Sequence, residues 1–68
     1  MIENRVKQYR KQRGLTQIDL ARQTGLTRQT IGLIESGKYN PSLKACLKIA
    51  AVLFTGLDAL FNPNSFDD

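Results

Sequence analysis

Between Gln17 and Ser36, one alanine, one glycine and four apolar residues are spaced as two short helices joined by a tight turn require. The segment reads QIDLARQTGLTRQTIGLIES. Two helices that cross near a right angle need a small residue where their backbones approach, and Ala21 stands at that position. Gly25 suits the reversal of the chain. The apolar positions that rest on the body of the domain are Leu20, Leu26, Ile31 and Ile34.

Capping signals set the bounds of these two helices. Thr16 suits the N-cap of a helix from Gln17 to about Thr24, because Asp19 then lies where a capping box has its acidic residue. Thr27 suits the N-cap of the next helix, which is expected to end before Gly37. The segment therefore predicts two helices of about two turns each.

Further helices are expected on both sides of this pair. Residues 2–13 are predicted to form an amphipathic helix that Gly14 ends. One face of that helix carries Ile2, Val6, Tyr9 and Arg13. After the loop SGKYNP, a fourth helix begins either with Asn40 as its cap and Pro41 at its first position, or with Ser42 as its cap.

The fourth helix has apolar residues on two adjoining faces. One apolar stripe consists of Leu43, Leu47, Ala50 and Phe54, with Cys46, Ile49 and Leu53 beside it. Lys44 and Lys48 are expected to face outward. A short fifth helix is predicted from Leu57 to Phe61. The expected fold is a compact all-α domain of five helices over residues 1–61, with a C-terminal tail over residues 62–68.

Composition narrows the function classes. The chain has 68 residues, a single cysteine and no histidine, which excludes a disulfide framework and a Cys/His zinc site. Six scattered acids offer no paired carboxylates, so we expect no enzymatic activity, no metal and no cofactor. No apolar run approaches a membrane span and no secretory signal is present, so a reducing cytoplasmic location is expected. Cys46 fits a small buried hydrophobe, with a redox switch as the alternative.

The charge is uneven along the chain. The net charge is +4, and residues 1–56 hold all ten lysines and arginines against three acids. The charged residues of the remaining segment, 57–68, are all acidic. A basic body favours a polyanionic partner, although a solvated surface would explain the same charges.

Taken in register, the motifs GLTQ, LA, TGLT, RQTI, IE, GK and NPSL resemble the lambda-repressor-like (Xre/Cro) helix-turn-helix family, and most closely its short stand-alone regulators. The resemblance covers nearly the whole chain and places the helix-turn-helix at residues 17–36. It implies that Arg10 pairs with Glu35, for which a plain surface glutamate is the alternative. It also implies that Gln17 contacts a phosphate. The loop residues expected to grip the DNA backbone are Ser36, Lys38, Tyr39 and Asn40.

In this family the first turn of the third helix enters the major groove. The residues there are Thr27, Arg28, Gln29 and Thr30. Arginine can read guanine through O6 and N7, and glutamine can read adenine through N6 and N7. Thr27 also serves as a cap, whatever its contact with DNA.

Leu33 cannot share the inward face of the third helix. It lies about 200° around the helix from Ile31, on the side of Gln29 and Thr30. Contact with a thymine methyl would suit an apolar residue there. The alternative is a stray exposed leucine, which is common on protein surfaces.

Phe54 departs from the glycine or asparagine that the family usually has at the end of the fourth helix. Because phenylalanine disfavours positive φ, that helix end is expected to differ. A self-association surface is predicted from Phe54, Leu57, Phe61 and Phe66. The alternative is that Phe54, Leu60 and Phe61 only complete the core, which is the better interpretation for Leu60.

These observations predict a sequence-specific regulator of double-stranded DNA, most simply a repressor that binds a palindromic operator as a homodimer. We expect no attached sensor domain, because no residues remain to build one. One rival is an antitoxin-type module of the same fold that binds a protein partner. Another is a nonspecific nucleic-acid binder, against which the pair Arg28–Gln29 argues.

Overall fold

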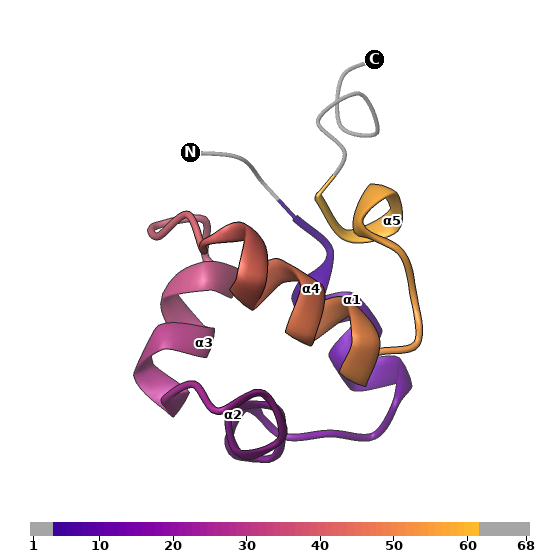
Figure 1. Ribbon diagram of the computed structural model, residues 1–68. Coiled ribbons are helices and arrows are strands. Elements are labelled where there is room, and N and C mark those ends of the chain that lie inside the picture. Colours follow the sequence, from indigo (N-terminus) through magenta and orange to yellow (C-terminus); the bar gives the residue numbers. More distant parts are fainter. Residues whose placement is uncertain (1–3, 62–68) are drawn as a thin grey trace.

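The computed structural model describes residues 4–61, which form five helices (Figure 1). Their bounds are α1 Val6–Gln12, α2 Gln17–Thr24, α3 Arg28–Glu35, α4 Leu43–Val52 and α5 Leu57–Phe61. Helix α4 runs across the middle of the molecule, with α3 beside it, α2 below and α5 above (Figure 1). Helix α2 packs on α3 and α4, α5 packs on α4, and α1 packs on α3. The predicted all-α, five-helix fold is confirmed over these residues.

The core lies where these helices meet. Its buried apolar residues are Val6, Leu20, Ala21, Ile31, Ile34, Ile49, Ala50, Leu53 and Leu60. The inward positions predicted for the helix-turn-helix segment are thus confirmed, except that Leu26 is only partly buried at the core's edge. Leu60 belongs to the core, as the sequence favoured. Each helix within residues 4–61 falls short of the length and apolar character needed to cross a membrane.

The caps of α2 and α3 are those predicted. Thr16 and Asp19 form a reciprocal capping box, with hydrogen bonds of 2.9 and 3.0 Å. Gly25 has a φ of +76°, and the next amide, that of Leu26, donates to the carbonyl of Ala21 over 3.0 Å. Glycine is needed here because a side chain at positive φ is strained. This turn therefore sets the angle between α2 and α3.

Helix α1 is shorter than the predicted 2–13. The side chain of Asn4 accepts the amide of Val6 over 3.1 Å and donates to the carbonyl of Ile34 over 2.8 Å. The amide of Arg5 donates to the carbonyl of Leu60 over 3.0 Å. Because these groups bond to other elements, the helix begins only at Val6; Ile2 lies outside the described residues.

Helix α4 is capped by Ser42, whose hydroxyl accepts the amide of Ala45 over 3.1 Å. This decides between the two alternatives for its start. Of the apolar stripe seen in the sequence only Ala50 is buried, while Leu43, Leu47 and Phe54 are exposed. The adjoining row of Cys46, Ile49, Ala50 and Leu53 faces inward instead. Both rows have helical spacing, and α4 can bury only one of them against its neighbours.

The end of α4 also corrects an expectation. Phe54 takes the left-handed conformation with a φ of +55°, so this helix end has the geometry that the family's glycine would give. The amides of Phe54 and Thr55 donate to the carbonyls of Ala51 and Ala50, which is the bonding of a Schellman motif. The guanidinium of Arg13 lies 4.7 Å from the centre of the Phe54 ring, and its Nε donates to the carbonyl of Leu53 over 3.2 Å. These contacts hold the strained residue in place.

Candidate nucleic-acid interface

The first turn of α3 is held by the two threonines predicted there. The hydroxyl of Thr27 accepts the amide of Thr30 over 3.0 Å and donates to the hydroxyl of Thr30 over 2.8 Å. Thr27 is therefore a cap, as the sequence indicated. The hydroxyl hydrogen of Thr30 remains available for a partner outside the chain.

Arg28 and Gln29 extend from that turn into solvent. Both side chains are exposed, and the structure gives neither of them a hydrogen bond or ion pair with any residue between 4 and 61. A guanidinium and a carboxamide side by side at a helix start match the acceptor pair of guanine and the donor–acceptor pair of adenine. The chemistry of this turn is thus suited to reading base edges.

Leu33 lies one turn further along α3 and is 38% exposed, while its neighbours Ile31 and Ile34 are fully buried. It therefore shares the outer face with Gln29, as its angle around the helix predicted. The carbonyl of Leu33 accepts the hydroxyl of Ser36 over 3.1 Å and the amide of Lys38 over 2.9 Å. These bonds end α3 and turn the chain into the loop.

Glu35 anchors the other end of α3 to the body. Its Oε2 accepts from Nε of Arg10 over 2.7 Å, and its Oε1 accepts from Nη2 over 3.3 Å. The two side chains are only 9% and 4% exposed. Nη1 of Arg10 donates to the carbonyl of Leu15 over 2.7 Å. The implied ion pair is present, and the alternative of a plain surface glutamate is excluded.

Gln17, at the start of α2, joins the same carboxylate. Its Nε2 donates to Oε1 of Glu35 over 3.0 Å. A Cβ added at Gly32 would lie 3.8 Å from this nitrogen, which is an ordinary van der Waals contact. A small side chain at position 32 would therefore still allow the hydrogen bond between Gln17 and Glu35. The other hydrogen of the amide nitrogen and the free amides at the helix start are donors of the kind that bind anions.

The loop after α3 carries three exposed polar side chains, those of Lys38, Tyr39 and Asn40, which have no partner within the part of the chain that is described. Because Gln17 bonds to Glu35, the start of α2 and this loop lie near the same end of α3. Arg28 lies about 10 Å away along the helix, at 1.5 Å per residue. That spacing is comparable with the major groove, which is about 12 Å wide.

A helix-turn-helix family model matches residues 6–60. The chain belongs to the lambda-repressor-like (Xre/Cro) helix-turn-helix family, whose members are DNA-binding transcriptional regulators. It is 42% identical to an uncharacterized HTH-type transcriptional regulator of Archaeoglobus fulgidus, over 98% of this chain and 91% of that one.

Two solved structures of family members resemble it closely. One is the restriction-modification controller protein C.AhdI from Aeromonas hydrophila, with 38% identity, a TM-score of 0.79, and coverage of 84% of this chain and 86% of that one. The other is SinR, a master regulator for biofilm formation, in complex with DNA. Its identity is 35%, its TM-score is 0.73, and the match covers 78% of this chain and 86% of that one.

The residues predicted for self-association differ in their exposure. Leu57 and Phe61 are half-buried and pack on the core, which for Phe61 agrees with the alternative interpretation, whereas for Phe54 that alternative is wrong. Phe54 is exposed beneath Arg13, and Phe66 lies outside the described residues. Cys46 is half-buried on α4, and burial raises the pKa of its thiol, which favours the hydrophobe over the redox switch.

Two contacts between distant parts of the chain were not predicted from the sequence. Asn4 ties the start of α1 to the carbonyl of Ile34 at the end of α3. An asparagine just before a helix often bonds to a nearby backbone amide, as Asn4 does to that of Val6, so this signal could have been found. Arg13 bonds to Leu53, 40 residues away, and no local pattern points to such a contact.

Proposed function

We propose that this protein is a repressor that binds a palindromic operator as a homodimer, with α3 in the major groove of each half-site. The DNA-binding unit is residues 1–61, and the match of the family to residues 6–60 supports this assignment. SinR, which shares the fold, has been solved on DNA, and its similarity supports double-stranded DNA as the partner of this chain.

The observation that carries the proposal is that two exposed side chains able to recognise bases lie on a helix whose far end is fixed to the rest of the fold. Arg28 and Gln29 are exposed at the start of α3. The far end of the same helix is fixed to α1 through Glu35 and Arg10. In base recognition, a helix held in this way fixes which base pair each side chain meets. Each bidentate contact contributes about 1–3 kcal/mol of discrimination.

Backbone contacts are proposed around this reading turn. The residues assigned to phosphates are Gln17, Ser36, Lys38, Tyr39 and Asn40, and Thr27 and Thr30 border the groove. Such contacts fix the register and supply affinity without carrying sequence information. Leu33 is assigned to a thymine methyl, because it is the apolar residue on the outer face of α3.

A homodimer and a repressor role follow from size. One module of this kind touches only a few base pairs, whereas a two-fold dimer reads two half-sites about 34 Å apart. A compact protein bound across a promoter blocks access to it, so occupancy alone suffices for repression. We expect no catalytic step and no cofactor.

Selection from random duplex DNA at near-physiological salt tests the proposal. The purified protein should enrich an inverted repeat whose half-sites are centred about ten base pairs apart. Each half-site should contain guanine and adenine at neighbouring positions, opposite Arg28 and Gln29. Enrichment of a single half-site would contradict the dimer. Absence of any enrichment would contradict sequence-specific binding and favour a protein-binding role.

A further inference from the structure

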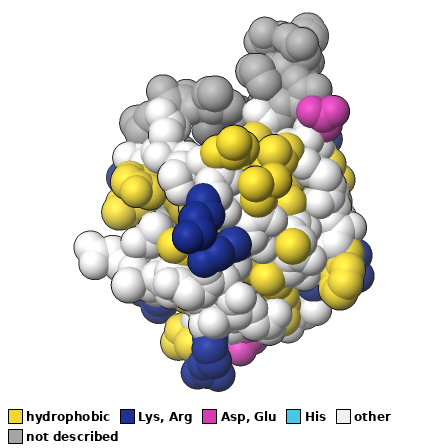
Figure 2. Space-filling view, viewed as in Figure 1, with side chains coloured by type: hydrophobic (Ala, Val, Ile, Leu, Met, Phe, Trp, Pro, Cys, Tyr) yellow, Lys and Arg dark blue, Asp and Glu magenta, His cyan; other side chains and the backbone are white. Residues whose placement is uncertain are grey.

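An apolar row runs along the exposed side of α4. Leu43 is 67% exposed, Leu47 is 52% exposed, and Phe54, just past the helix end, is 77% exposed. Ala51 lies between them and is also exposed. Residues four apart lie on one side of a helix, so Leu43, Leu47 and Ala51 form a single ridge. Figure 2 shows apolar side chains gathered on this face over α4.

Neither the core nor the DNA interface accounts for this row. Helix α4 buries its other side, through Ile49 and Leu53. The base-reading turn belongs to α3. The other large exposed apolar residues on helices between residues 4 and 61 are Leu33 on α3, already assigned to DNA, and Ile18 on α2; a single exposed apolar residue needs no partner. Contiguous apolar patches of a few hundred Å², by contrast, often mark interaction sites.

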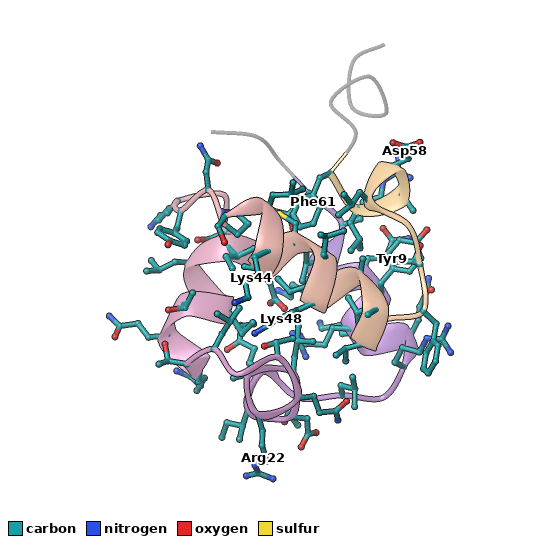
Figure 3. The ribbon with its side chains drawn as sticks, viewed as in Figure 1. Tyr9, Arg22, Lys44, Lys48, Asp58 and Phe61 are labelled. Carbon is teal, nitrogen blue, oxygen red and sulfur yellow. The ribbon has the colours of Figure 1, made fainter. Side chains whose placement is uncertain are left out.

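Two lysines border the row along one edge. Lys44 and Lys48 project from the same side of α4 (Figure 3), and neither has an ion pair within residues 4–61. The side chains of the row carry no charge, and Arg13 stacks only on Phe54 at its end. A surface of this kind can be buried without desolvating the lysines, which stay at the rim where interfaces are polar.

The order of residues along the row is self-complementary. If two copies of α4 lie antiparallel about a two-fold axis near Leu47, each Leu43 lies opposite Ala51 of the other copy. A large side chain then meets a small one at both ends of the contact, as ridges fit grooves. The two-fold axis also keeps all four lysines on one edge, outside the contact.

We propose that this α4 row is where a second copy of the chain docks, with Leu47 at the two-fold axis and Leu43 packed on the partner's Ala51. The inference rests on the homodimer of the proposed function and names its surface. This contact differs from the surface of Phe54, Leu57, Phe61 and Phe66 predicted from the sequence, and it has Phe54 at its margin.

The size of the row sets the strength of the dimer. One phenylalanine and two leucines at these exposures present on the order of 400 Å² per copy, since large side chains bury roughly 150–250 Å² each. Standard interfaces bury about 800 Å² per partner. The dimer is therefore weak in free solution and forms fully when two half-sites bring the copies together.

Sedimentation of Leu47→Glu beside Ile18→Glu tests the surface. The two side chains are 52% and 51% exposed, so the substitutions have similar costs in the monomer. Between about 1 and 200 µM, wild type and Ile18→Glu should have the same dimer dissociation constant. Leu47→Glu should raise that constant at least about 100-fold, because dimerisation would then bury an unpaired charge. The half-site DNA affinity of Leu47→Glu should stay within about threefold of wild type, while Ile18→Glu, next to the phosphate contact proposed for Gln17, serves as a control for dimerisation alone.

The outcomes separate this inference from the proposed function. If Leu47→Glu dimerises like wild type, or Ile18→Glu loses as much, the α4 surface is wrong while the dimer stands. If wild type is monomeric both in solution and on a full inverted repeat, the homodimer itself fails.

A crosslink gives a positive readout that does not depend on a disruptive charge. In a Cys46→Ser background, Leu47→Cys should form a disulfide-linked dimer on mild oxidation, because the two thiols meet at the axis. Ile18→Cys in the same background should stay monomeric. Equal crosslinking of both variants, or none for Leu47→Cys, would overturn the proposed surface.

Discussion

Arg10 and Glu35 lie 25 residues apart and join α1 to the last residue of α3 through a 2.7 Å ion pair that solvent barely reaches. The carboxylate accepts from Arg10 twice and from Gln17 once. The side chain of Glu35 therefore links α3 to both α1 and α2.

Glu35→Ala is expected to destabilise the domain by about 3–5 kcal/mol, because it leaves the Arg10 guanidinium buried without its counter-charge. For a domain of this size that is a large share of the total stability. Urea unfolding followed by circular dichroism measures the loss. Replacing both partners, as Arg10→Met with Glu35→Leu, should recover most of it. A loss below about 1 kcal/mol for Glu35→Ala would mean that the pair acts like an exposed one.

Arg28→Ala is expected to relax preference at one base position of each half-site and to cost about 1–3 kcal/mol on the best site only. Lys38→Ala should instead weaken all sequences about equally. Competition binding against single-base operator variants distinguishes the two patterns. An equal loss on every sequence for both variants would make Arg28 a phosphate contact.

Salt dependence should report the backbone contacts. If a dimer neutralises six to eight phosphates, the slope of log K against log salt is roughly −5 to −7. Lys38→Ala should reduce the magnitude of that slope by about one for each phosphate that the lysine neutralises. Titrations at several salt concentrations provide the measurement. A slope that Lys38→Ala leaves unchanged would place this lysine away from the DNA.

Phe54→Gly and Phe54→Val should differ in stability by about 1–2 kcal/mol in favour of glycine, since a β-branched residue at positive φ is strained and glycine is not. Neither variant can stack its side chain on Arg13, so the difference isolates the backbone. Thermal unfolding at low concentration measures it. Equal stability of the two variants would show that the left-handed conformation is not retained in solution.

Acid should weaken the capping box of α2. The pKa of Asp19 is lowered by its hydrogen bond from the backbone of Thr16, with a further contribution from the Thr16 hydroxyl. A lowered pKa stabilises the fold above the unfolded value of about 3.9, and that stability is lost as pH falls through the folded value. The stability gap between wild type and Asp19→Asn should therefore be full at pH 7 and close below about pH 4.

Urea midpoints at several pH values give this gap directly. In a Thr16→Ala background, which should itself cost about 1 kcal/mol, the gap at pH 7 should be smaller, because one of the two causes of the pKa shift is gone. A gap that stays constant down to pH 2 would contradict the capping role of Asp19.

Features that depend on neighbouring residues could be predicted from the sequence. Thr16, Gly25 and Thr27 act through bonds to residues at most four positions away, so their types alone indicate the helix bounds. Leu33 was predicted outward from its angle around α3. The Arg10–Glu35 pair came from family resemblance, and no local signal would have joined residues 25 positions apart.

Features decided by packing could not be predicted. Two apolar rows of α4 have the same helical spacing, and only the placement of α5 and the core selects Ile49 and Leu53 over Leu43 and Leu47. Phe54 violates a local rule because Arg13, distant in sequence, supports it. The contacts of Arg28 and Gln29 with bases remain predictions, since they need a partner outside the chain.

The bond between Gln17 and Glu35 fixes more than a distance. An ionised carboxylate can only accept hydrogen bonds, so the Gln17 side-chain amide points its Nε2 toward Glu35 and its oxygen away from it. Because the amide is planar, the second hydrogen on that nitrogen then points in one direction. A phosphate at the start of α2 would meet a donor that is already aimed, with its rotational freedom already given up in folding. The hydrogen bonds of Glu35 that hold α3 in place would thereby also preorganise the contact of Gln17 with the DNA backbone.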